Sequence, residues 1–117
     1  MTLREIKDLL QAEVLTGEEL LDIEPTSICG SDLLSDVLAF TKEKSLLLTG
    51  LTNSQVIRTA EMSDLIGIVF VRGKKPDNAT IELATIKKIP LLATRLPMFE
   101  SCGILYRGGA RGCSEVK

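Results

Sequence analysis

The sequence predicts an α/β fold in three layers, in which a mostly parallel sheet is flanked by helices. Three strand-then-helix units follow one another at 45–62, 65–88 and 90–106, and such units form parallel sheets with crossover connections. Hydrophobic residues make up 44% of the chain but aromatics only 3%, which is typical of aliphatic strands covered by helices on both faces. At 117 residues there is room for one hydrophobic core. We therefore expect a single domain over 1–106 and, because no apolar period continues beyond it, a flexible C-terminal tail over 107–117.

The chain begins with a helix signal. Thr2 and Glu5 have the spacing of a capping box, in which two side chains satisfy free amides of a first helical turn. Apolar residues at three- and four-residue steps then predict a helix over 2–11. The segments expected next are a strand at 12–16, a second strand piece at 20–24 and an extended segment at 26–31.

Strands and helices alternate over the rest of the chain. Ser31 or Asp32 can cap the first of these helices, and Thr52, Asn53 or Ser54 can cap the second. Short aliphatic runs closed by glycine or polar residues predict buried parallel strands. The expected elements are helices at 34–40, about 54–62, 78–88 and 97–106, strands at 45–49, 65–71 and 90–93, and a turn at 72–77.

Charge and composition exclude several classes of function. The net charge of −2, with basic residues spread along the chain, argues against nucleic-acid binding, and four aromatic residues are too few for a base-stacking platform. No apolar run is long enough to span a membrane, and the N-terminus lacks the apolar stretch of a signal peptide, so we expect a cytoplasmic protein. The absence of histidine and of a C-x-x-C motif argues against a transition-metal site, and no cofactor is expected.

Polar side chains and glycines cluster where the predicted strands end. In open α/β sheets, ligands bind at the carboxyl ends of the strands near helix N-termini. Hydroxyls, glycine amides and arginines suit an anionic or sugar-phosphate group there. The competing interpretation is structural, because helix caps and tight turns require the same residue types without any ligand, and an arginine can be a solvated surface charge. The candidate ligand-binding residues are Ser31, Asp32, Thr49, Gly50, Thr52, Asn53, Arg72, Gly73, Thr94 and Arg95.

Catalytic motifs are absent from the sequence. It contains neither the phosphate-binding loop G-x-x-x-x-G-K-[ST] nor G-x-G-x-x-G, and without histidine a serine or cysteine nucleophile lacks its usual base. Asp32 and Asp36 are one helical turn apart and could do acid–base work or hold Mg²⁺, although such a pair more often marks the first turn of a helix. We therefore predict that the protein is not an enzyme.

Three cysteines, Cys29, Cys102 and Cys113, are widely spaced. In a cytoplasmic chain they should be reduced thiols. We expect Cys29, in a strand, and Cys102, in an apolar helix, to pack in the core. Cys113 falls in the predicted tail, where it should be exposed.

The order of elements resembles that of a DRTGG domain, and the resemblance covers nearly the whole chain. The segments that carry it are Ala-Glu-Val-Leu-Thr-Gly at 12–17, Gly-Ser-Asp-Leu-Leu-Ser-Asp at 30–36, Leu-Leu-Leu-Thr-Gly at 46–50, Ile-Gly-Ile-Val-Phe-Val-Arg-Gly at 66–73 and Ile-Pro-Leu-Leu-Ala-Thr at 89–94. The resemblance implies an α/β domain similar to the N-terminal domain of HPr kinase/phosphorylase. Such domains occur alone or fused to CBS-domain pyrophosphatases and to phosphotransacetylases. A regulatory role, self-association and the lack of assigned catalytic residues are implied as well.

This chain departs from the motif that names the family. The motif should fall after the strand at 45–49 and at the end of the strand at 65–71, where this sequence reads Thr49-Gly-Leu-Thr-Asn-Ser54 and Val71-Arg-Gly73. Asp-Arg is absent and Thr-Gly-Gly is reduced to Val-Arg-Gly. Gly73 is the one position we transfer, as a backbone turn.

Two functions remain as hypotheses. The first is a regulatory module, a homodimer, that senses a nucleotide or phosphorylated metabolite at the carboxyl ends of the strands. The alternative is a protein-interaction adaptor with no small-molecule ligand. It is suggested by a mean hydropathy of +0.20, high for so small a domain, which places apolar surface in an interface.

Overall fold

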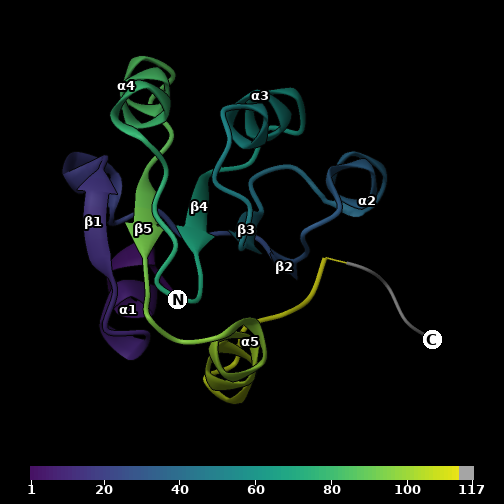
Figure 1. Ribbon diagram of the computed structural model, residues 1–117. Coiled ribbons are helices and arrows are strands. Elements are labelled where there is room, and N and C mark those ends of the chain that lie inside the picture. Colours follow the sequence, from purple (N-terminus) through teal and green to yellow (C-terminus); the bar gives the residue numbers. More distant parts are fainter. Residues whose placement is uncertain (114–117) are drawn as a thin grey trace.

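The computed structural model describes residues 1–113, which form one five-stranded sheet with helices on both faces (Figure 1). The strand order is β1-β5-β4-β3-β2; β1 runs antiparallel to β5, and the other neighbours are parallel. The predicted three-layer α/β fold with a mostly parallel sheet is therefore confirmed. The strands are β1 (Glu13–Thr16), β2 (Ile28–Gly30), β3 (Leu46–Thr49), β4 (Gly67–Phe70) and β5 (Leu91–Ala93), and the helices are α1 (Leu3–Leu9), the 3₁₀ turn η1 (Glu18–Leu20), α2 (Leu34–Phe40), α3 (Gln55–Met62), α4 (Asn78–Ile86) and α5 (Met98–Arg107).

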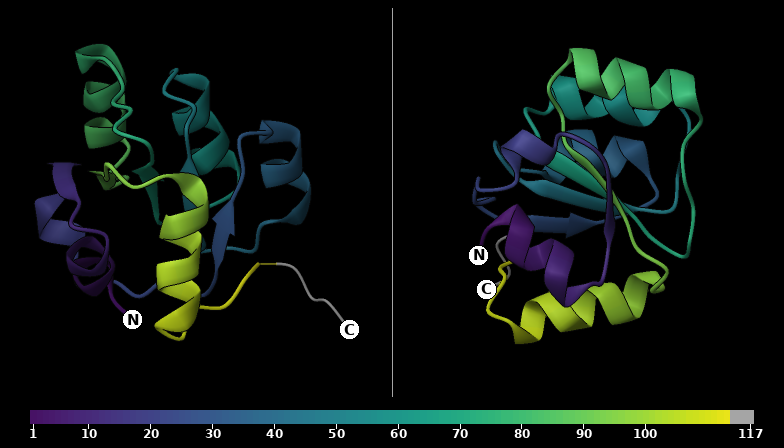
Figure 2. Two further views of the ribbon diagram at one scale, coloured as in Figure 1. Left: turned by 60° about the horizontal axis from the view of Figure 1, so that its bottom comes forward. Right: turned by 90° about the vertical axis from the view of Figure 1, so that its left-hand side faces the viewer.

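The helices divide between the two faces of the sheet. Helices α2, α3 and α4 lie on one face, and α1 and α5 on the other (Figures 1 and 2). Side chains alternate along each strand, so Leu47 packs under α2–α4 while Leu46 and Leu48 pack against α1 and α5. All three leucines are fully buried. Each contributes about 1.5–3 kcal/mol through burial, which explains why so aliphatic a strand lies in the interior of the sheet.

The chain order creates one reversal at the carboxyl ends of the parallel strands. Strands β2 to β5 follow one another across the sheet, and the helices between them all pack on the same face. After β5, however, the chain crosses to the opposite face to form α5 (Figure 2). The loops after β4 and β5 therefore leave the sheet in opposite directions, and such a switch point is where open α/β sheets bind ligands.

Four helices end in the same way. In α1, α3, α4 and α5, the two amides after the C-cap donate back to carbonyls of the last turn, which is the Schellman motif. In α3, for example, the Leu65 amide donates to the Ala60 carbonyl (2.9 Å) and the Asp64 amide to the Glu61 carbonyl (3.2 Å). The motif requires a left-handed residue after the C-cap. The residues that fill this position are Gln11, Asp64, Lys88 and Gly109.

The N-terminal capping box of Thr2 and Glu5 is confirmed, but the second strand piece expected at 20–24 is wrong. Gly17 adopts a left-handed conformation (φ 86°) and turns the chain into η1. The following carbonyls then accept hydrogen bonds from the first amides of α1: Leu3 donates to Ile23 (3.0 Å) and Arg4 to Leu21 (2.9 Å). This segment completes a helix terminus rather than joining the sheet.

The C-terminal segment stays close to the domain for as far as it is described. Helix α5 continues to Arg107, one residue past the expected boundary. The chain then runs beside β2, where the Ile28 amide donates to the Arg111 carbonyl (2.8 Å) and Ile28 forms a parallel bridge with Gly112. The predicted flexible tail over 107–117 thus begins with contacts to the sheet, and residues 114–117 lie outside the described part of the chain. No helix within the described residues is long and apolar enough to cross a membrane.

Candidate functional site

The ten candidate residues lie at the carboxyl ends of β2, β3, β4 and β5; Thr49 is the last residue of β3, and the other nine are in the loops that follow the four strands. Parallel pairing places these four loops along one edge of the sheet. Within this edge, two groups of contacts form. One joins the loops after β2, β3 and β4, and the other joins the loops after β4 and β5.

Asp32 connects the first two loops. Its Oδ1 atom accepts hydrogen bonds from the Gly50 amide (2.7 Å) and from the Thr49 hydroxyl (2.9 Å). The Thr49 hydroxyl is buried and in turn accepts a hydrogen bond from the Leu51 amide (3.1 Å). Asp32 is thus a cross-link between loops. The sequence had suggested Ser31 or Asp32 as the cap of α2, and neither side chain has that role. Helix α2 has no side-chain cap at all.

Arg72 follows β4 in a backbone conformation that non-glycine residues rarely adopt. Its φ is 61°, and Gly73 follows with a φ of 71°. The Lys74 amide donates to the Val71 carbonyl (3.2 Å), so the chain makes a tight turn with two left-handed central residues. Gly73 is therefore in a turn, as expected. For Arg72 the conformation costs about 1–2 kcal/mol, and no helix terminus accounts for it.

The Arg72 guanidinium lies over Gly50. A Cβ atom on Gly50 would be 2.8 Å from Nη2 of Arg72 and 3.5 Å from each carboxylate oxygen of Asp32. The glycine therefore provides the space in which the guanidinium and the carboxylate approach the same backbone position. Among residues 1–113, neither the Arg72 nor the Arg95 side chain forms an ion pair. Both residues are exposed.

The loops after β4 and β5 hold each other through the backbone. The Arg72 amide donates to the Leu96 carbonyl (2.8 Å), and the Gly73 amide donates to the Thr94 carbonyl (2.9 Å). Thr94 is buried, and its hydroxyl donates to the Leu10 carbonyl at the end of α1 (2.7 Å). These hydrogen bonds hold the Arg72 backbone in place and join the two loops across the switch point. The Arg72 side chain therefore extends from a fixed backbone position.

Several candidates have local structural roles. The Asn53 carboxamide accepts a hydrogen bond from the Gln55 amide (3.0 Å), and the Ser31 hydroxyl accepts one from the Leu33 amide (3.0 Å). Thr49, Thr94 and Asp32 are likewise engaged within the protein, as described above. The structural interpretation therefore accounts for these five residues. The accessible groups that remain at this edge are Gly50, Thr52, Arg72, Gly73 and Arg95.

Other charged side chains surround this edge. Lys75 pairs with Glu13 at the start of β1. Asp77 caps α4 by accepting from the Thr80 amide (2.8 Å), and this hydrogen bond lowers the pKa of the Asp77 carboxyl. Asp36 lies in the first turn of α2, whereas Asp32 lies outside that helix. Residues 1–113 contain no group of three acidic or thiol side chains placed to hold a metal ion.

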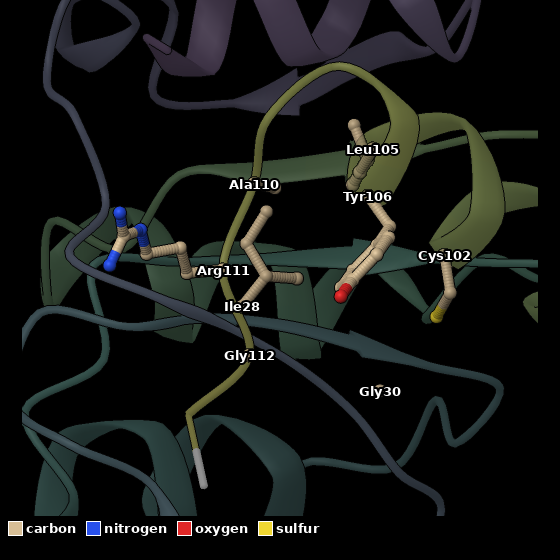
Figure 3. Close-up of a pocket in the computed structure, with 8 residues that line it drawn as sticks. All are labelled: Ile28, Gly30, Cys102, Leu105, Tyr106, Ala110, Arg111 and Gly112. Atoms are coloured by element: carbon tan, nitrogen blue, oxygen red, sulfur yellow. The ribbon is translucent and has the colours of Figure 1, made fainter. Parts of the chain in front are cut away.

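Sequence reasoning missed a feature at the outer edge of β2. A cavity of about 190 Å³ lies there between α5 and the returning C-terminal segment (Figure 3). Cys102 lines it, with Sγ 2.8 Å from where a Cβ atom on Gly30 would lie. Cys113, expected to be exposed, is only 8% exposed. Nothing in the glycine-rich sequence around Cys113 could indicate this, because its burial depends on the return of the chain to β2. The residues that line the cavity are Ile28, Gly30, Cys102, Leu105, Tyr106, Ala110, Arg111 and Gly112.

Comparison with known families agrees with the order of elements. A model of the DRTGG domain family matches residues 5–107, most of the chain. The chain belongs to the DRTGG family. No curated protein matches this DRTGG domain.

One solved structure gives the same fold. It is the crystal structure of the CBS and DRTGG domains of the regulatory region of Clostridium perfringens pyrophosphatase, complexed with its activator, diadenosine tetraphosphate. The TM-score is 0.77 at 19% sequence identity, and the alignment covers 99% of the present chain. The present chain covers 50% of the pyrophosphatase chain, so it matches half of that region's length.

Proposed function

We propose that this DRTGG domain is a non-catalytic regulatory module of the cytoplasm that binds a phosphate-bearing metabolite or nucleotide at the carboxyl ends of β3, β4 and β5. The observation that carries the proposal is Arg72. A tight turn and hydrogen bonds to the loop after β5 hold its left-handed backbone, and its exposed guanidinium lies over Gly50 without an ion pair among residues 1–113. Strain of this kind persists where a function depends on the orientation it produces.

The surroundings of Arg72 support an anionic ligand. A guanidinium offers a planar fork of donors that matches phosphate oxygens. Gly50 presents no side chain that would hinder an approaching phosphate, and Arg95 supplies a second exposed guanidinium in the next loop. The related pyrophosphatase region, which is regulatory and binds a nucleotide activator, supports the same class of role.

The acidic and hydroxyl groups favour binding over catalysis. Asp32 and Thr49 spend their hydrogen-bonding capacity on each other and on the Gly50 amide. A general base must be within reach of the proton that it abstracts. Because Oδ1 of Asp32 already accepts two hydrogen bonds within the protein, we assign this carboxylate to linking the loops and propose no chemical step for the site.

Thermal unfolding with a panel of nucleotides, dinucleotides and phosphorylated metabolites tests the proposal. A ligand at about one hundred times its Kd adds about 2.7 kcal/mol of stability. Arg72→Gly should abolish this shift while keeping the backbone, because glycine accepts a positive φ. Arg107→Ala is the matched control, since it removes an exposed arginine from the last turn of α5, at the opposite end of the strands. If no compound shifts the wild type, or if Arg72→Gly keeps the shift, the ligand part of the proposal fails.

A second function, self-association as a homodimer or docking to a larger partner, is favoured by the outer surface of α5. Phe99 is 85% exposed and Tyr106 is 76% exposed, and they lie on one face of the helix with Gly103 between them. Exposed aromatic side chains in such a row are typical of protein interfaces. Light scattering at micromolar concentration tests self-association: a dimer that becomes a monomer in Phe99→Ser/Tyr106→Ser supports it. A wild-type monomer contradicts it and leaves capture of another protein as the test of docking.

A further inference from the structure

Two cysteines distant in the sequence become neighbours at the edge of β2. Ile28 and Gly112 form a parallel bridge, supported by the hydrogen bond from the Ile28 amide to Arg111. In parallel strands, the residues that follow a bridged pair lie beside each other with their side chains on the same face. Cys29 and Cys113 are those residues. Adjacent strands are close enough for their Cα atoms to fall in the range that a disulfide spans.

The two thiols share a protected environment. Cys29 packs against the core under α2, and Cys113 is buried beside it. The pKa of Cys29 is raised to about 12, chiefly because the thiol is buried and to a lesser extent because it is hydrogen-bonded with the Cys113 thiol. The charges of Cys113, Cys102 and Asp36 raise it further. Cys29 is therefore protonated at neutral pH, so it is not the thiol that makes the first attack on a disulfide.

Cys102 lies on the other face of the sheet. Its Sγ faces Gly30 in the cavity beneath α5 (Figure 3), and it packs with the core cluster of α1 and α5. Cys29 belongs to the opposite cluster. The strand separates the two, so the third thiol is a natural internal control.

We propose that Cys29 and Cys113 are a disulfide-forming pair, a covalent modification site whose co-substrate is a small-molecule disulfide such as oxidised glutathione. Cys113, as its thiolate, attacks one glutathione sulfur, breaks the glutathione disulfide and releases one glutathione thiolate, which takes up a proton. Cys29 then loses its proton and attacks the Cys113 sulfur of the mixed disulfide, which releases the second glutathione. Two protein thiols are oxidised to one disulfide, and one glutathione disulfide is reduced to two thiols.

The bond would fasten the returning segment to the sheet. Residues 110–112 form one wall of the cavity beside α5, so oxidation would fix that wall against β2. The closed loop would run from residue 29 to residue 113, about three quarters of the 117-residue chain. A cross-link of this length restricts the unfolded state strongly, so the melting temperature should rise on oxidation.

Tryptic mapping under non-reducing conditions tests the pair directly. Cleavage after lysine and arginine places the three cysteines on separate peptides, at 8–42, 96–107 and 112–117. The intact protein is incubated with oxidised glutathione, the remaining thiols are blocked, and the digest is analysed by mass spectrometry. We expect a linked species of 8–42 with 112–117, formed equally in wild type and in Cys102→Ser, together with a higher melting temperature that a reductant reverses.

Cys113→Ser should lose both the link and the rise in melting temperature on oxidation. Under reducing conditions its melting curve should stay close to that of the wild type, which verifies that the variant folds. A link that involves the 96–107 peptide would overturn the proposal. So would glutathione adducts on unlinked 8–42 and 112–117 peptides.

Discussion

The two ends of the parallel strands use the same unusual backbone conformation for different purposes. At the amino ends, Asp64 and Lys88 have positive φ and directly precede the chain's entry into β4 and β5. Each completes a Schellman motif, so helix termination explains its conformation. At the carboxyl ends, Arg72 has a similar φ but follows a strand. At one end the conformation terminates helices, whereas at the other it forms a tight turn that, in our proposal, places a guanidinium.

The two ends also differ in the space around a left-handed glycine. At the amino end, Gly17 lies against Pro90, and an added Cβ atom would be 2.6 Å from the proline Cα. At the carboxyl end, Gly73 has open space around the same position. A side chain at Gly17 would therefore meet packed backbone, whereas a side chain at Gly73 would meet nothing within 4 Å. The following substitutions test this contrast.

The largest effect is expected for Gly17→Ala, compared with Gly73→Ala. Both residues have positive φ, but only Gly17 also meets backbone atoms. Strain and overpacking together should lower the free energy of unfolding by about 2–5 kcal/mol in Gly17→Ala, and strain alone by about 1 kcal/mol in Gly73→Ala. Urea denaturation of the two variants measures the difference. Equal losses would refute the packing contrast between the two ends.

A smaller effect of opposite sign is expected for Arg72→Gly and Lys88→Gly. Glycine adopts the left-handed region without steric cost, so both should raise the free energy of unfolding by up to about 1 kcal/mol. The two variants should separate in ligand response, which only Arg72→Gly should lose. Chemical denaturation, repeated with any compound that stabilises the wild type, measures both properties. If Lys88→Gly also lost the response, the distinction between the two ends would be wrong.

Gly50→Ala sharpens the account of how Arg72 is positioned. The new Cβ atom would meet Nη2 of Arg72 at 2.8 Å, and that flexible side chain can move away without disturbing the backbone. The melting temperature should change little, whereas binding of a phosphate-bearing compound should weaken. Isothermal titration calorimetry tests this, with Gly103→Ala as a control at a helical glycine whose Cβ position is open. Unchanged affinity in Gly50→Ala would mean that the observed position of the guanidinium is irrelevant to binding.

The smallest effect is a pH dependence at the start of α4. The hydrogen bond from the Thr80 amide makes the pKa of Asp77 lower in the folded state than in the unfolded state. The ionised carboxylate therefore stabilises the fold fully at pH values above the unfolded pKa, and this stabilisation is lost as the pH falls through the folded pKa. Asp77→Asn keeps a capping side chain that does not titrate. The stability advantage of the wild type over this variant should shrink as the pH drops from about 7 to about 3. A pH-independent difference would show that the charge of Asp77 plays no part in the cap.

The fold was predictable where the sequence carries local signals. The aliphatic strands β3, β4 and β5 and the capping box of Thr2 and Glu5 depend on neighbouring residues alone. The segment at 20–24 did not follow this logic, because its carbonyls accept hydrogen bonds from Leu3 and Arg4 of α1, which are distant in the sequence. Local pattern cannot predict a bond of that kind.

The positions of the candidate residues in the fold were predictable, but their contacts were not. Chain order placed them at the carboxyl ends of the strands, and Ser31, Thr49, Asn53 and Thr94 make hydrogen bonds within the loops there, which agrees with the structural interpretation. That Asp32 would reach the Gly50 amide, and that Arg72 would be left-handed, depends on how neighbouring loops meet. The contact of Cys29 with Cys113 depends likewise on the return of the chain to β2.

The most direct test of the central claim, that Arg72 anchors a phosphate group, is a titration followed by ¹H–¹⁵N NMR. Wild type and Arg72→Gly are titrated with pyrophosphate and with the nucleotide that gives the largest thermal shift. The account predicts that shifts concentrate on the amides of Gly50, Arg72 and Gly73 and on the Arg72 side-chain Nε–H, and that they vanish in Arg72→Gly. Shifts that persist in the variant, or that gather at the amino ends around Asp64 and Lys88, would contradict it.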